Sequence, residues 1–281
     1  MKYQDNHVIE ANDLSFDGVL RDVKKSQAAL QPIFECFTNA LEAVRIKQKF
    51  IPGYKGKITI KIDTTETLIE NDELKRNTEF SSLSITDDGI GFNDEEFSRF
   101  NKYKQSDKGF NNLGSGRIQF VHYFDSTTVK SVFEQDGKFF ERKFHVSKNK
   151  DFLGKNAIVK HIYCKETDAL DTETTVSFKT LLNDSNGIYD DLNAQTLKDK
   201  LIERYIYYFC YNKDNLPEIS IEFHIRSKLQ EKSCILQTDI PKIDKTCQVT
   251  IPYSTKGRKG TKKTKIQRFS LLMLLEFQKN F

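Results

Sequence analysis

A turn that directly follows an alternating segment is the first candidate for ligand chemistry. It reads Asp87-Asp88-Gly89-Ile90-Gly91-Phe92. Its two glycines stand one residue apart, and because they lack a Cβ atom the backbone can approach a ligand closely. The Asp87 carboxylate can accept a hydrogen bond from an exocyclic amine. An ordinary Asp-Gly turn has the same composition, so the turn alone leaves both interpretations open.

A glycine-rich stretch that leads into a predicted helix is the second candidate. It reads Gly109-Phe-Asn-Asn-Leu-Gly114-Ser-Gly116-Arg117. The first amides of a helix lack partners within the helix, so this N-terminus could bind an anion, although a plain helix start explains it equally well. Neither the Walker A pattern nor the dinucleotide pattern G-x-G-x-x-G occurs in the chain.

Two further clusters are weaker when each is taken alone. Glu35 and Asn39 stand four residues apart in a predicted helix and project from one face, away from the apolar stripe at Phe37 and Leu41. A carboxylate and an amide so placed are also common on a solvated helix face. Thr174 lies in a predicted strand, where threonine is an ordinary residue.

The elements that must position these residues are helices over a sheet. Apolar residues at helical spacing predict a helix from about Ser26 to Lys49 and a shorter one over 115–124. Alternation predicts the strands, and Asp136-Gly137 predicts a hairpin among them. These strands cover 57–63, 80–86, 127–133, 138–146, 157–163 and 174–182. The pattern indicates an α+β fold in which helices cover one face of a largely antiparallel sheet.

The domain organisation follows from the remaining elements. A helix from about Leu197 to Cys210, followed by the strand EISIEFHI, resembles the start of another α+β unit. We therefore expect one domain over 1–190 and a short or partial second unit over 191–281.

Composition excludes several classes of protein. No apolar run approaches the roughly 20 residues of a membrane span, and the first residues lack a signal peptide, so we expect a cytoplasmic protein with no membrane contact. Five scattered cysteines without a C-x-x-C pair argue against a disulfide framework and a zinc site. The net charge of +4 is too small for a nucleic-acid footprint over the whole chain. Residues 256–268 hold seven basic side chains in thirteen positions, and form either a solvated loop or a polyanion contact.

Taken in order, the four clusters resemble the motif series of the GHKL ATPases, the superfamily of gyrase B, a heat-shock chaperone, the histidine kinases and MutL. The matching motifs are Glu35-Cys-Phe-Thr-Asn39-Ala-Leu-Glu42-Ala for the N-box, Asp87-x-Gly89-x-Gly91 for the adenine motif, Gly114-x-Gly116 for the lid and Thr174-x-Val176 for the last motif. The resemblance covers about residues 25–185 and implies the Bergerat fold, a two-layer α/β sandwich that binds ATP.

The resemblance implies a role for each matched residue at the base end of the nucleotide. Asp87 would accept from the adenine amino group, and Thr174 would support Asp87 through water. Gly89 and Gly91 would line the adenine pocket.

At the phosphate end, Asn39 would bind Mg²⁺ through its amide oxygen, and the metal would bridge the phosphates of ATP. Gly114 and Gly116 would bring lid and helix amides to the phosphates. Lys108 resembles a lid lysine that contacts the terminal phosphates. Glu35 would be the catalytic residue that polarises the attacking water.

Two departures from the family pattern are present, and other features bear on the branch. Glu42 stands where many members have Asp, and the lid is short, with four residues between Gly109 and Gly114. Arg117 and the hairpin SVFEQDGKFFERKF look most like a group of large bacterial ATP-binding proteins of unassigned role.

These roles imply an ATPase that hydrolyses ATP to ADP and phosphate. Relatives with the catalytic glutamate use ATP to close a lid and to bring two ATP-binding domains together, so we expect a nucleotide-gated switch and an ATP-dependent homodimer. Two alternatives remain open: an ATP-binding interaction module with little turnover, and a DNA-acting ATPase of the topoisomerase or MutL sort.

Overall fold

The computed structural model describes residues 3–11, 15–69, 75–102, 116–182, 186–241, 243–256 and 262–274 of the 281-residue chain. The chain divides into two compact units. The first comprises Met1–Asp199 and Pro217–Ile235, and the second comprises Lys200–Leu216 and Leu236–Phe281.

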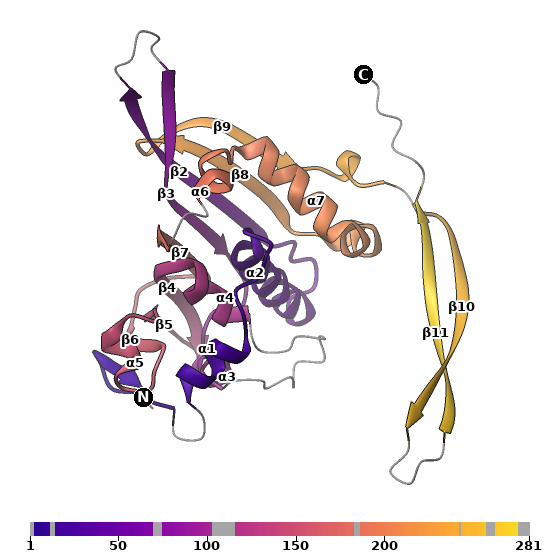
Figure 1. Ribbon diagram of the computed structural model, residues 1–281, viewed down its shortest axis with the longest axis horizontal. Coiled ribbons are helices and arrows are strands. Elements are labelled where there is room, and N and C mark those ends of the chain that lie inside the picture. The colour runs from indigo at the N-terminus through magenta and orange to yellow at the C-terminus, as the bar shows by residue number, and fades with distance from the viewer. Residues whose placement is uncertain are drawn as a thin grey trace. The chain divides into compact units, whose positions relative to one another are not determined.

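The first unit contains most of the helices and a large sheet (Figure 1). Its helices are α1 (Phe16–Asp22), α2 (Gln31–Phe50), α3 (Asp94–Asn101), α4 (Gly116–Tyr123), α5 (Lys150–Leu153) and α6 (Asn186–Asp190). Its strands are β1 (His7–Ile9), β2 (Lys57–Ile69), β3 (Lys75–Asp87), β4 (Phe124–Gln135), β5 (Lys138–Val146), β6 (Val159–Glu166), β7 (Glu173–Leu181), β8 (Glu218–Ile225) and β9 (Lys228–Ile235). Helix α7 (Ala194–Tyr211) begins in the first unit and continues in the second.

The nine strands form one mixed sheet in the order β1-β6-β5-β4-β7-β3-β2-β8-β9. Neighbouring strands pair antiparallel except β2 and β8, which pair parallel. The α+β fold class predicted from the sequence is confirmed. Strands β8 and β9, which follow residue 190, extend the same sheet beyond β2, and the division of the chain at that residue stays a prediction.

The core of the first unit lies between the sheet and the helices that cover it. On α2, Ile33, Phe37 and Val44 are fully buried, as the apolar stripe predicts. The sheet contributes alternate residues of neighbouring strands, such as Ile60 beside Ile85. Helix α2 packs against β2, β3 and α4, while α4 packs against β4 and α6 against β3.

The start predicted for the long helix is wrong by five residues, because α2 begins at Gln31 rather than Ser26. Pro32 has no N–H and lies in the first turn of the helix, where N–H groups have no partner within the helix and proline is tolerated. The segment before it is bound by side chains of α4 instead. Gln119 accepts a hydrogen bond from the Ser26 N–H at 2.9 Å, and the Tyr123 hydroxyl donates to the Ser26 carbonyl.

The predicted hairpin between β4 and β5 is present. Asp136 and Gly137 have φ values of 53° and 74°, and two consecutive positive values are typical of the type I′ turn that an Asp-Gly pair favours.

The second unit holds the rest of α7, two short 3₁₀ helices and a separate hairpin. The 3₁₀ helices are η1 (Lys213–Asn215) and η2 (Gln237–Asp239), and strands β10 (Ile243–Lys256) and β11 (Lys262–Leu274) pair antiparallel. Of the basic segment 256–268, Lys256 ends β10 and pairs with Lys262, residues 262–268 belong to β11, and 257–261 lie outside the described residues. Its side chains lie outside the described residues, so the polyanion contact stays a prediction.

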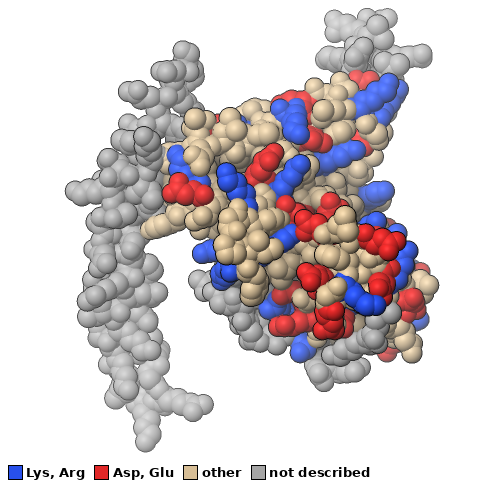
Figure 2. Space-filling view, turned by 180° about the vertical axis from the view of Figure 1, so that it is seen from behind, with Lys and Arg blue, Asp and Glu red and all other residues tan. Residues whose placement is uncertain are grey.

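Two surface properties bear on function. None of the helices in the described ranges is both long enough and apolar enough to cross a membrane. On the face shown in Figure 2, Lys and Arg side chains are interspersed with Asp and Glu, and the described residues of this face form no large area of one sign.

Candidate functional site

Asp87 ends β3 on the face of the sheet that the helices cover, and only 5% of it is exposed. Its neighbours across the strands are Ile58 of β2 and Thr174 of β7, and Thr174 in turn faces Ser131 of β4. The Thr174 and Ser131 hydroxyls are 2.8 Å apart and hydrogen-bonded. The next row of the sheet holds Ile85 and other apolar residues. A row of polar residues therefore runs from β3 through β7 to β4 on this face, and Asp87 and Thr174 lie side by side in it.

The two glycines after Asp87 lie where a larger residue would not fit. A Cβ atom on Gly89 would lie 2.5 Å from the Ala43 carbonyl carbon and 2.7 Å from the Val44 nitrogen, so the turn packs directly on the backbone of α2. Gly91 has a φ of +72°, and a Cβ atom there would lie 2.5 Å from the Val132 carbonyl oxygen. Both positions therefore require glycine. Gly89 allows the close approach to α2, and Gly91 allows both a close approach to β4 and the positive φ.

Burial gives the Asp87 carboxyl an unusual ionisation. Loss of hydration raises its pKa from 3.8 to about 8, although its Oδ1 accepts a hydrogen bond from the Gly89 N–H at 3.0 Å. The carboxylates of Asp88 and Glu173 raise the pKa further, and Lys47 lowers it. A buried carboxyl group with so costly a charge is typical of a site that binds a donor.

Glu35 lies half-buried on α2, where its Oε1 accepts a hydrogen bond from Gln31 Nε2 at 2.7 Å. It contacts the first residue of α4, because a Cβ atom on Gly116 would lie 3.0 Å from the Glu35 carboxyl carbon and closer still to its Oε2. The structure thus brings the predicted catalytic carboxylate against the N-terminus of α4. Asn39, one turn further along α2, is exposed.

Helix α2 connects the two ends of the candidate site. Gly116 packs on Glu35 near the start of the helix, and Gly89 packs on Ala43 in its second half. Cys36 is buried between them, and the negative charge of Asp87 contributes to raising the pKa of its thiol, after burial itself. Two predicted site residues, Lys108 and Gly114, lie outside the described residues.

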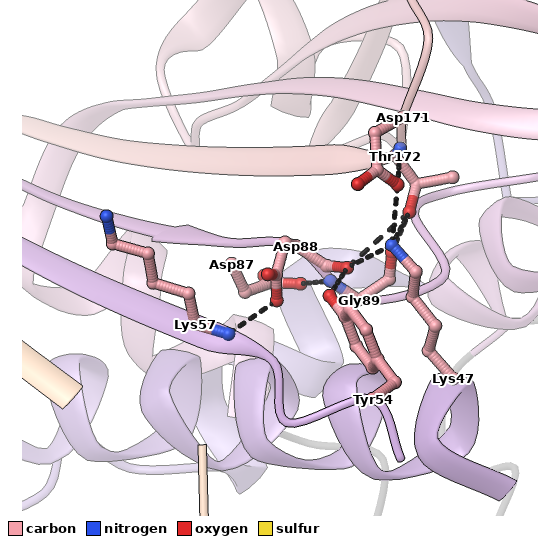
Figure 3. Close-up of polar contacts among 8 residues, drawn as sticks. All are labelled: Lys47, Tyr54, Lys57, Asp87, Asp88, Gly89, Asp171 and Thr172. Carbon is pink, nitrogen blue, oxygen red and sulfur yellow. Dashed lines mark hydrogen bonds and ion pairs between the residues drawn. The ribbon is translucent and has the colours of Figure 1, made fainter. Parts of the chain in front are cut away.

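A cluster around Lys47 fixes the turn after Asp87 and was missed in the sequence (Figure 3). Lys47 Nζ donates to the Asp88 carbonyl at 2.9 Å, to Asp171 Oδ1 at 2.7 Å and to Thr172 Oγ1 at 2.9 Å. The Tyr54 hydroxyl also donates to the Asp88 carbonyl, at 2.8 Å. Thr172 Oγ1 donates to the Gly89 carbonyl. The turn is therefore held by α2, by the segment after α2 and by the loop before β7.

A second missed group fixes the chain between Gly91 and α3. Ser131 Oγ accepts a hydrogen bond from the Phe92 N–H at 2.9 Å. Arg142 of β5, the next residue in the polar row, donates to the Phe92 carbonyl at 2.6 Å and pairs with Asp94. Only 1% of Arg142 is exposed.

Both missed cations carry a signal in the sequence. Arg142 stands at an alternate position of β5 between Phe140 and Phe144, so it shares the inward face of the strand. Lys47 follows Ala40 and Val44 at helical spacing and so continues the buried stripe of α2. A charge in register with apolar residues predicts a buried, paired group.

Comparisons with known proteins give a distant likeness of fold. No protein-family model matches the chain, and no curated protein matches it in sequence. Among solved structures, the ATPase and transducer domains of DNA topoisomerase II from Balamuthia mandrillaris have a TM-score of 0.39 at 11% identity, over 80% of this chain and 56% of that one. The N-terminal domain of a DNA repair protein also has a TM-score of 0.39 at 11% identity, over 79% of this chain and 60% of that one. The chain thus spans less than two thirds of either structure.

Proposed function

We propose that the chain binds ATP with Mg²⁺ and hydrolyses it to ADP and phosphate. The observation that carries the proposal is that sequence motifs from distant parts of the chain meet along α2. Gly116 contacts Glu35, Gly89 contacts Ala43, and Asp87 is paired across the strands with Thr174. These are the residues for which the GHKL resemblance implies one nucleotide site.

The residues at the base end fit an adenine ring. Asp87 offers a buried carboxyl group that, when ionised, can accept from the exocyclic amino group. Gly89 and Gly91 let the backbone approach a planar ligand. Thr174 shares the polar row with Asp87 and would support it through water.

The residues at the other end fit the phosphates and a metal. The exposed amide of Asn39 would bind Mg²⁺ through its oxygen, the kind of ligand this ion prefers. When bound, the metal neutralises negative charge that develops on the phosphates. Gly116, Gly114 and Lys108 would contact the phosphates.

Glu35 would act as the general base. Its carboxylate would take a proton from a water molecule while the water oxygen attacks the terminal phosphorus and the bond to the β-phosphate oxygen breaks. The products are ADP and inorganic phosphate. The contact with Gly116 and the hydrogen bond from Gln31 limit where this carboxylate lies.

Titration calorimetry with ATP and Mg²⁺, combined with a phosphate-release assay, tests the proposal. The wild type should bind ATP and release phosphate. Asp87→Asn should lose measurable binding, because the amide also carries donors, at a cost of about 1–3 kcal/mol or more for the unpaired buried groups. Wild-type affinity in this variant would remove the adenine assignment, and binding without phosphate release would favour the interaction module.

The finer part of the proposal is a nucleotide-gated switch in which ATP closes a lid and joins two copies of the chain. This part is supported by the GHKL resemblance and by Glu35, which accompanies such a cycle in the resembling branches.

A further inference from the structure

We propose that Lys47 is a positioning residue for the nucleotide base. Lys47 holds the turn after Asp87 against α2 and favours the ionised Asp87 carboxylate, which can accept a hydrogen bond from the adenine amino group. The inference rests on the proposed function. It assigns a role to a residue outside the motifs that suggested that function.

The geometry shows how one side chain could set the position of the turn. The three donors of the Lys47 ammonium group go to three acceptors, the Asp88 carbonyl, Asp171 Oδ1 and Thr172 Oγ1. Thr172 Oγ1, which accepts from Lys47, in turn donates a hydrogen bond to the Gly89 carbonyl. Lys47 therefore joins the end of α2 to both peptide carbonyls that follow Asp87, and Figure 3 shows these contacts.

Surface ion pairing does not account for this lysine. Its partner Asp171 has a side chain that is 71% exposed, and an ion pair with so exposed a group contributes little to stability. Lys47 itself is 7% exposed, so its charge has lost most of its hydration. An apolar residue would continue the buried stripe of α2 without that cost. The buried charge is explained if it acts on the turn and on Asp87.

The charged groups around Asp87 show why the loss of Lys47 should change the pKa of Asp87. Helix α2 presents Cys36 and Lys47 to Asp87, the turn presents Asp88, and β7 presents Glu173. Tyr54, from the segment after α2, also interacts with Asp87. Among these described groups Lys47 is the cation, and it lowers the pKa of Asp87, which burial raises.

Ionisation decides whether Asp87 can serve the base. Because Oδ1 already accepts from the Gly89 N–H, Oδ2 is the oxygen left for the amino group. The ionised carboxyl group can accept there, whereas in the acid form a proton on Oδ2 would meet the amino donor. ATP affinity should therefore rise with pH as Asp87 loses its proton. Loss of Lys47 should move this rise to higher pH.

Lys47→Met, Lys47→Arg, Asp171→Asn and Thr172→Val in the full chain test the inference by two measurements. The first is the titration of the Asp87 carboxyl carbon by NMR in nucleotide-free protein, assigned with Asp87→Asn. The second is calorimetric ATP affinity from about pH 6 to about pH 10, the range over which a carboxyl with so raised a pKa ionises.

We expect Lys47→Met to raise the Asp87 midpoint by about one pH unit, and to weaken ATP binding about tenfold near neutral pH with recovery at high pH. Lys47→Arg should restore most of the wild-type profile because it keeps the charge. Asp171→Asn should change ATP affinity less than about threefold, since its carboxylate is exposed. Thr172→Val should shift the midpoint in the same direction as Lys47→Met, and it supplies the test if that variant does not fold.

An Asp87 midpoint unchanged in both Lys47→Met and Thr172→Val would overturn the inference. So would an ATP affinity that falls by the same factor at every pH, because that pattern would show that Lys47 does not act through the ionisation of Asp87. If the wild type binds no ATP, the proposed function fails, and with it the ligand named here. An unchanged titration in a protein that does bind ATP contradicts the role of Lys47 alone.

Discussion

At the scale of single residues, the site consists of groups that lower the stability of the folded protein when no ligand is bound. The Asp87 carboxyl is buried beside the carboxylates of Asp88 and Glu173, and both raise its pKa. Gly89 and Gly91 occupy positions that exclude a Cβ atom. Such costs are typical of functional sites, where a protein gives up stability to keep a binding geometry.

The Asp87 carboxyl should make the free energy of unfolding depend on pH. Its pKa is about 8 in the folded protein and 3.8 without the fold, so the folded protein holds the proton more tightly. The resulting stability is complete below about pH 4 and is lost as the pH rises through about 8. The Asp87→Asn variant has no carboxyl proton to release, so its stability does not fall in this way. Its side-chain oxygen can still accept a hydrogen bond from the Gly89 N–H. Relative to wild type it should therefore gain about 2–4 kcal/mol between pH 5 and pH 8.

Urea unfolding of nucleotide-free wild type and Asp87→Asn at the two pH values measures this difference. Other titrating groups are common to both proteins and cancel in the comparison. A difference that stays constant between pH 5 and pH 8 would show that Asp87 is ionised in the folded protein throughout.

Gly116 should control the position of the catalytic carboxylate. A methyl group at this position would overlap Glu35 Oε2, and the flexible carboxylate is the group that can move away. Gly116→Ala should therefore lower ATP turnover by about tenfold or more, as expected for a misplaced general base. ATP affinity should stay near wild type, and stability should not fall because alanine is the better helix former.

Gly187→Ala in α6 is the matched control, since no atom lies within 4 Å of a Cβ atom placed there. It should leave turnover unchanged. Full turnover in Gly116→Ala would remove Glu35 from the mechanism or show that α4 shifts without effect.

At the scale of elements, the polar row across the sheet links the site to the loops around it. Thr174 and Ser131 continue the row from Asp87, and Arg142 extends it to β5. Ser131 and Arg142 bind the N–H and the carbonyl of Phe92, so strands β4 and β5 set where α3 begins. The sheet thereby determines the path of the chain on the far side of the two glycines.

The amino-acid sequence predicted the elements better than the contacts between them. Apolar periodicity found α2 and the alternating strands, because burial of one face imposes that pattern. It placed the start of α2 too early, since Ser26 is bound by side chains of α4, which are distant in sequence. The same limit applies to the site. Asp87 and Gly89 stand out in a local turn, whereas Lys47 acquires its role only when the loop that holds Thr172 folds back beside it.

One residue of β7 has a strained backbone conformation, and a substitution can relieve this strain. Thr180 of β7 has a φ of +57°, a left-handed conformation that is unfavourable for a β-branched residue, and its side chain is exposed. Asparagine tolerates this conformation, so Thr180→Asn should raise the free energy of unfolding by about 0.5–1.5 kcal/mol. Thr65→Asn on β2, also exposed but with negative φ, should lower it slightly because asparagine is disfavoured in strands. Urea unfolding decides, and equal signs for the two changes would contradict strain at Thr180.

At the scale of the whole molecule, charge gives little support to a role on nucleic acid. The formal net charge is +4, and the face in Figure 2 carries both signs among the described residues. The described residues of the basic segment, Lys256 and 262–268, belong to β10 and β11 of the second unit. The DNA-acting alternative rests on that segment, and a salt-dependent DNA-binding assay on the full chain tests it.

The switch proposal predicts that hydrolysis limits the lifetime of an ATP-bound dimer. Glu35→Ala should keep ATP affinity near wild type, because the base and the metal would be bound by other residues, while turnover falls by about 10²- to 10⁴-fold. If ATP joins two copies, this variant should accumulate as a dimer with ATP and Mg²⁺, since the step that resets the site is blocked. Sizing chromatography with ATP, with ADP and without nucleotide measures this, and Asp87→Asn is the control that should stay monomeric in all three. A Glu35→Ala protein that binds ATP, does not hydrolyse it and stays monomeric would contradict the dimer and leave the ATPase, whereas one that hydrolyses at the wild-type rate would contradict the general base.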